Sequence, residues 1–86
     1  MKIKLYSIKD KLEEFQGVLA INDEKIAKRI FESYCKKQKT EQYTDAKYYE
    51  LYELGEFETK TGVINGYSKQ EIKLIAEGEQ FDEQRT

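Results

Sequence analysis

The chain has 86 residues, with 15 lysines and arginines, 17 aspartates and glutamates, a net charge of −2, no histidine and no proline. Histidine is the usual general base and the commonest zinc ligand, and the single cysteine, Cys35, provides neither an internal disulfide nor a thiolate metal site. We therefore expect one domain over residues 1–86, fraying from about residue 79, with no enzymatic activity, no cofactor and no metal.

The N-terminal part of the chain predicts two strands. Residues 2–8 alternate apolar and polar side chains with a period of two, which is typical of a half-buried strand. Residues 9–16 fit either a helical turn or a loop, in which Leu12 and Phe15 would share a face. The short apolar run at residues 17–21 predicts a second strand.

Residues 22–39 carry the clearest pattern, that of an amphipathic helix. Asn22 or Asp23 can cap its first turn by accepting a hydrogen bond from a backbone N–H, and lysines near its end suit the helix dipole. Apolar side chains recur along one stripe, which predicts a face packed against a core. The stripe consists of Ile26, Ala27, Ile30, Phe31, Tyr34 and Cys35. We expect Cys35 to be a core residue and not a nucleophile.

The second half of the chain begins with an expected loop at residues 38–47, which lack apolar periodicity. Residues 48–54 are rich in tyrosine and indicate a strand with bulky side chains on both faces. Such a strand suits a central position in a sheet that a helix covers on one side. We expect Tyr49 and Leu51 to share one face of it.

The remaining segments predict turns and short strands. Gly62 can take the positive φ that a tight turn demands, residues 63–64 begin the return strand, and residues 65–68 form another turn. Residues 68–77 are ambiguous. Ser68 and Glu71 are spaced as a capping box, which favours a helix, but the apolar residues that follow alternate, which favours the strand that we prefer.

These elements predict an α+β fold: a small, mostly antiparallel sheet of three to five strands packed against one principal amphipathic helix. No run of about 18 apolar residues is present, so we expect no transmembrane helix. The first ten residues lack the apolar core of a signal peptide, and one cysteine fits a reducing compartment. We expect a cytoplasmic protein.

The basic residues and the tyrosines together form a candidate nucleic-acid site. Residues 1–40 carry ten basic and six acidic residues, whereas residues 41–86 carry five basic and eleven acidic ones. A chain that is not basic overall needs a local patch to bind nucleic acid, and tyrosines on a sheet can stack unpaired bases. The candidates are Lys2, Lys4, Lys28 and Arg29 for phosphates, and Tyr48 and Tyr52 for stacking. The alternative is that the tyrosines fill the core and pair across strands.

A second candidate surface is acidic. Glu53, Glu56 and Glu58 lie among aromatic residues, and such a surface could bind a basic groove on a host protein, such as a defence nuclease or a polymerase. The protein would then be a small inhibitor or adaptor. A homo-oligomer whose tyrosines form the subunit interface is compatible with either hypothesis.

Three segments carry a resemblance to a known family: "MKIKLYSIKD", "NDEKIAKRIFESY" and "YYELYELGEFETKTG". They resemble the small nonstructural protein of gokushovirus-type microviruses, which are single-stranded DNA phages, and related small phage proteins. That family has a strand bearing lysine and tyrosine, an amphipathic helix, and an aromatic LYxLGE(F/Y/W) segment before an acidic TG turn. The matching residues are Tyr6, Ser7, Ile8, Ala27, Phe31, Leu51, Tyr52, Leu54, Gly55, Glu56, Phe57, Thr61 and Gly62.

The resemblance implies a phage accessory protein that acts in single-stranded DNA synthesis or packaging, in the cytoplasm of an infected bacterial host. It implies binding to single-stranded nucleic acid or to the phage replication or packaging machinery. The family supplies no catalytic residues.

Overall fold

The computed structural model describes residues 1–82 and contains five strands, two α-helices and one 3-10 turn. In chain order these are β1 (Lys2–Asp10), β2 (Phe15–Ile21), α1 (Glu24–Glu41), η1 (Ala46–Tyr48), β3 (Tyr49–Glu58), β4 (Ile64–Gly66), β5 (Lys73–Glu77) and α2 (Glu79–Asp82).

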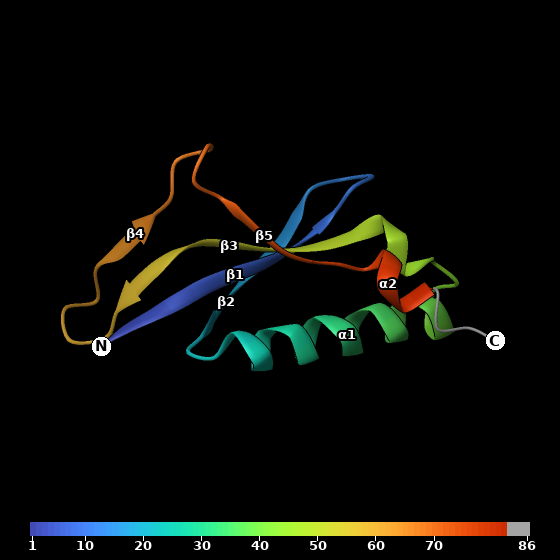
Figure 1. Ribbon diagram of the computed structural model, residues 1–86, viewed down its shortest axis with the longest axis horizontal. Helices are drawn as coiled ribbons and strands as arrows, with labels where there is room; N and C mark the ends of the chain where they lie inside the picture. Colours follow the sequence, from blue (N-terminus) through green and yellow to red (C-terminus); the bar gives the residue numbers. More distant parts are fainter. Residues whose placement is uncertain (83–86) are drawn as a thin grey trace.

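The strands form one sheet in the order β2-β1-β3-β4, and β5 also pairs with β3. Every pairing is antiparallel. The principal helix, α1, lies along one face of this sheet, and α2 lies near the C-terminal end of α1 (Figure 1). The predicted α+β class is therefore confirmed, with five strands and one principal helix.

The hydrophobic core lies between α1 and the sheet. Three side chains of the sheet point toward the helix. Tyr6 and Ile8 are two residues apart on β1 and so share a face, and Leu51 of β3 lies on the same face because it pairs with Ile8. From α1 the core receives Ala27, Phe31 and Cys35, which recur at spacings of four. Burying one face of the helix against one face of the sheet is the packing that the two sequence periods predict.

The helix begins as its sequence indicates, but its apolar stripe is only partly buried. Asp23, and not Asn22, is the N-cap: its carboxylate accepts a hydrogen bond of 2.9 Å from the backbone N–H of Lys25. Ile26 and Ile30 remain 42% and 40% exposed. The stripe is wider than the contact that the sheet offers, so the prediction that all of it packs against the core is wrong for these two residues.

The N-terminal hairpin is more regular than its sequence indicates. β1 continues to Asp10, whose carboxylate accepts a hydrogen bond from the backbone N–H of Leu12 and so organises the turn. Phe15 is already part of β2, so Leu12 and Phe15 do not share a helical turn. Residues 17–21 are a strand, as predicted.

The C-terminal segments agree with the sequence predictions at some positions and differ at others. Gly62 has φ +78°, as the predicted turn requires. Asn65 and Gly66 belong to β4 and not to a turn. The backbone N–H of Ser68 donates to the Glu71 carboxylate at 2.9 Å, as in a capping box, but the chain makes only a turn there before β5, the predicted strand.

The C-terminal tail begins with a short helix. Glu79–Asp82 forms α2, residues 83–86 lie outside the described part, and the fraying expected from about residue 79 stays a prediction. Phe81 packs edge-to-face against Phe31 of the core, with ring centroids 5.9 Å apart. Within residues 1–82, neither α1 nor α2 combines the length and the apolar character that a transmembrane span requires.

Candidate functional site

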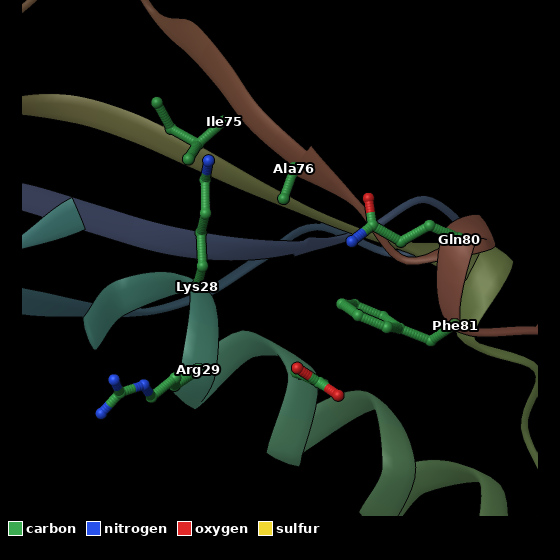
Figure 2. A pocket seen from close by; sticks show the side chains of 7 residues that line it. Lys28, Arg29, Ile75, Ala76, Gln80 and Phe81 are labelled. Atoms are coloured by element: carbon green, nitrogen blue, oxygen red, sulfur yellow. The ribbon is translucent and has the colours of Figure 1, made fainter. Parts of the chain in front are cut away.

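A pocket of about 170 Å³ opens between α1, β5 and α2, and Figure 2 shows its lining. Ala27 and Phe31 face the core. The next residues in the chain, Lys28 and Glu32, therefore lie at the rim of the buried helix face. The α1–β5–α2 pocket is lined by Lys28, Arg29, Glu32, Ile75, Ala76, Gln80 and Phe81.

The aromatic wall of this pocket is Phe81. Figure 2 shows its ring extending from α2 into the space between β5 and α1. The backbone of α2 is fixed by Asp82, whose carboxylate accepts hydrogen bonds from the backbone N–H groups of Ala46 and Lys47 at 3.1 and 2.8 Å. Asp82 also pairs with Lys39 at 3.0 Å. Phe81 is thereby held between a polar clamp and the core.

Asp82 remains charged over a wide pH range because of this clamp. Burial alone would raise the pKa of the carboxyl group, but the hydrogen bonds from Lys39, Ala46 and Lys47 outweigh burial and lower the pKa. The ionised carboxylate therefore contributes to holding α2 in place, together with the packing of Phe81 on Phe31.

The cationic rim of the pocket consists of Lys28 and Arg29. Lys28 pairs with Glu24 at 3.3 Å across one turn of α1, and Glu32 pairs with Lys36 at 2.8 Å. Such exposed pairs at i,i+4 contribute only about 0.3–0.5 kcal/mol, so an anionic ligand can compete for the lysine. Arg29 has no ion-pair partner within residues 1–82 and keeps its guanidinium donors available.

The other two predicted cations lie elsewhere, on β1. Lys4 donates to the Glu56 carboxylate at 3.0 Å and to the Tyr67 hydroxyl at 3.3 Å, and lies 3.5 Å from Glu53. The hydrogen bond to Glu56, followed by that to Tyr67, raises the pKa of Lys4 well above its usual value. Lys2 lies 3.9 Å from Glu56. Lys4 is therefore engaged within the protein.

The acidic candidates belong to the same network. Glu53 is 7% exposed and accepts a hydrogen bond of 2.5 Å from the Tyr67 hydroxyl, so it offers little surface to a partner. Glu56 pairs with Lys2 and Lys4, and Glu58 pairs with the N-terminal ammonium at 2.9 Å. The three carboxylates lie on one strand, but each has a cation or a phenol beside it.

The two tyrosines predicted to stack bases lie apart from the pocket. Tyr52 is next to Leu51 on β3, so its side chain is on the face of the sheet opposite α1, where its ring contacts Phe15 edge-on at 5.6 Å. Its hydroxyl donates to Glu50. Tyr48 ends η1 and has the Lys47 ammonium 5.4 Å from its ring centre.

The six predicted nucleic-acid residues thus fall into separate groups. Lys28 and Arg29 both line the α1–β5–α2 pocket, although their side chains leave α1 in different directions (Figure 2), whereas Lys2 and Lys4 lie on β1. The sequence patterns did not identify Phe81 or Tyr67 as site residues. The sequence offered one indication of the pocket, a single large apolar residue, Phe81, within a polar C-terminal segment.

Two observations on the described residues bear on the chemistry available near the site. Within residues 1–82 no three His, Cys, Asp or Glu side chains gather as metal ligands. Cys35 is fully buried, and burial raises the pKa of its thiol to about 12, so little thiolate is present near neutral pH. A cationic rim beside an aromatic wall is suited to an anionic ligand with a flat ring.

Comparison with known protein families gives a match over nearly the whole described chain. The family model described as Phage ORF5 protein matches residues 3–81, which run from β1 into α2. No curated protein and no solved structure matches the chain. The predicted kinship with small phage proteins is confirmed, while the narrower likeness to the gokushovirus type stays a prediction. The chain belongs to the Phage ORF5 protein family.

Proposed function

We propose that this protein is a non-enzymatic phage accessory protein that binds single-stranded nucleic acid through the α1–β5–α2 pocket. The observation that carries the proposal is a single pocket whose lining includes the two cations Lys28 and Arg29 and the ring of Phe81. Figure 2 shows Lys28 directed toward β5 and the guanidinium of Arg29 directed outward, away from that ring. Membership of a phage protein family supports the phage context. The same site is available to single-stranded DNA during phage replication or packaging.

The size of the pocket suits one ring. A protein cavity of about 150 Å³ holds a benzene molecule, and this pocket has about 170 Å³. Stacking of one base on an aromatic side chain contributes about 1–3 kcal/mol of binding free energy, and it does so for all four bases. Phe81 and the apolar side chain of Ile75 would contact the base, in a pocket that is open at its rim.

The phosphates would be contacted from the rim. Lys28 and Arg29 are consecutive on α1, and Arg29 can also lay its planar guanidinium against a base or grip a phosphate with two hydrogen bonds. Two phosphate contacts give weak binding that depends on salt, with about 0.7 of a counterion released for each contact on a single strand. The expected mode is a short, sequence-tolerant contact.

The acidic hypothesis has less support from the geometry. An inhibitor that binds a basic groove needs free carboxylates, but Glu53 is buried and Glu56 and Glu58 have internal cationic partners. Binding to a protein of the replication or packaging machinery through the pocket remains the second candidate, because a phosphorylated or acidic aromatic segment would satisfy the same cations.

The test is fluorescence anisotropy of the purified chain with a labelled oligothymidine at about 50 and 200 mM salt, the range in which phosphate contacts lose affinity. We expect binding at the lower salt and a marked loss at the higher salt. Arg29→Gln should weaken binding and reduce the salt dependence. Absence of binding at the lower salt would refute the proposal.

The matched control is Lys60→Gln, which removes the same charge from the exposed turn at the other end of the sheet. An equal loss in both variants would mean that net charge, and not the pocket, causes binding. Tyrosine emission provides a second readout. Quenching by the oligonucleotide that disappears in Tyr52→Leu would move the binding surface to the open face of the sheet, as the sequence predicts for Tyr48 and Tyr52.

A further inference from the structure

One edge of the sheet lacks the protection that strand edges usually have. β2 pairs with β1 on one side and with no other strand within residues 1–82. Its residues Gln16–Ala20 are exposed, and the whole strand contains neither a charged residue nor a proline. Charges, prolines and short length are the usual defences of an edge. By contrast, β4 has three residues, and β5 begins with Lys73 and ends with Glu77.

The regular part of this edge is Val18–Ile21. These residues pair in register with Ser7 to Lys4 of β1, whereas the register shifts before Val18. In an antiparallel ladder, alternate residues direct their N–H and C=O groups outward, so this stretch offers a set of backbone donors and acceptors to another strand.

An apolar groove runs beside the same edge, on the face that α1 covers. It has a volume of about 220 Å³ and is lined by Ile8, Gln16, Gly17, Leu19, Ile30 and Tyr34. Leu19 of β2 and Ile30 of α1, which line this groove, are large apolar side chains that remain exposed. The edge and the groove form one continuous surface, which we name the β2 edge surface.

We propose that the β2 edge surface binds a second copy of this chain, with the two β2 strands pairing antiparallel about a two-fold axis. A two-fold axis perpendicular to the sheet that passes beside residue i places i opposite i of the partner and i−n opposite i+n, and opposed residues point to the same face. Both α1 helices therefore lie on the same side of a continuous sheet. The exposed apolar residues of the two grooves then lie on that same side of the joined sheet, next to the pairing strands.

Charge complementarity favours a second copy over other occupants. The paired strands bring no like charges together, since neither has a charged residue. The two-fold axis also makes the α1 helices antiparallel. The acidic first turn of one helix, with Asp23 and Glu24, then lies level with the basic second half of the other, with Lys36 and Lys37. This inference does not depend on what the α1–β5–α2 pocket binds.

The decisive measurement is the molar mass of the full chain by sedimentation equilibrium up to about 1 mM, where even millimolar dissociation constants become visible. We expect the wild type to form dimers as its concentration rises. The double variant Val18→Lys/Ala20→Lys should be monomeric throughout. It sets a lysine opposite a lysine whether the axis passes through Val18, Leu19 or Ala20.

The matched control is Val63→Lys/Ile64→Lys, because Ile64 is 66% exposed and Val18 is 60% exposed, and both double variants add two charges at surface positions. It should dimerise like the wild type. Circular dichroism of each variant verifies the fold. A wild type that is monomeric at all concentrations overturns the proposal, and so does a dimer that the lysines in β2 leave intact.

Cysteine crosslinking locates the axis. Residues directly opposite in an antiparallel pair have Cα atoms about 4.5 or 5.5 Å apart, within the range for a disulfide. Among single variants Val18→Cys, Leu19→Cys and Ala20→Cys, we expect one to form an intermolecular disulfide far faster than Ile64→Cys. Cys35 is buried and should not interfere. Equal rates at Ile64 and in β2 would contradict pairing through this edge.

Discussion

The two ends of the molecule are built differently. At the end that we name the helix end, side chains from the sheet are enclosed by α1, η1 and α2. At the other, the strand end, β1, β3 and β4 continue past the first turn of α1, and no described helix covers them (Figure 1). The helix end is held by apolar burial, with Phe31 and Cys35 inaccessible to solvent. The strand end has few buried apolar side chains and must be held by other interactions.

At the strand end these interactions are polar. Tyr67, between β4 and β5, donates to Glu53 of β3, and Lys4 of β1 joins Glu53, Glu56 and Tyr67. One small network thus links both central strands to the connection that leaves β4. A domain 46 Å long can therefore extend beyond its apolar core where the polar groups at its other end satisfy one another.

The largest expected effect comes from the helix end. Phe31→Ala removes a fully buried ring that contacts Phe81, and such truncations cost about 3–5 kcal/mol because a cavity remains. Urea unfolding should show most of the protein's stability lost. The control is Ile64→Ala at the exposed strand end, which should change stability by less than about 0.5 kcal/mol. A small effect of Phe31→Ala would mean that this core is not the source of stability.

An intermediate effect is expected at the strand end. Tyr67→Phe leaves the Glu53 carboxylate buried without its phenol donor, which should cost about 1–3 kcal/mol. Hydrogen exchange should show faster opening of β4 than of α1. Tyr43→Phe is the matched control, because Tyr43 is exposed and makes no such bond. If both variants unfold at the same urea concentration, the network does not stabilise the strand end.

Local patterns in the sequence predicted those parts of the fold that short-range physics decides. Gly62 was predicted as a turn because only a positive φ closes that hairpin. For residues 68–77 the preferred strand was confirmed as β5, whereas the Ser68–Glu71 contact closes only a turn and the helix that it favoured does not form. The helix followed from its 3.6-residue period for the same reason, and its N-cap is Asp23, one of the two residues that the sequence offered.

The candidate site was harder to predict, because long-range placement decides it. Tyr67 and Glu53 are 14 residues apart, and nothing in their spacing joins them without the register of β3. Phe81 reaches the pocket only because Gly78 lets the chain pass against the backbone of Ala46, where an added Cβ would clash. Likewise, the sequence identified Lys28 and Arg29 but could not show that they share a rim with Phe81.

The smallest expected effect tests whether the helix end also depends on polar contacts. Asp82→Asn weakens the clamp that holds α2 to η1 and α1, and at pH 7 it should cost about 1 kcal/mol or less, because an amide oxygen still accepts hydrogen bonds. The pKa of Asp82 is lowered in the folded chain, below an unfolded value of about 3.9. Its contribution is therefore full above that value and disappears as the pH falls through the folded pKa.

Asparagine does not titrate, so the stability difference between the wild type and Asp82→Asn should shrink between pH 7 and about pH 3, measured by urea unfolding. Asp45→Asn is the control, because the side chain of Asp45 makes no capping bond to η1. Since the apolar packing of Phe81 on Phe31 supports the same element, losing the clamp should cost less than losing Tyr67. A larger loss for Asp82→Asn than for Tyr67→Phe would show that both ends of the molecule depend mainly on polar contacts.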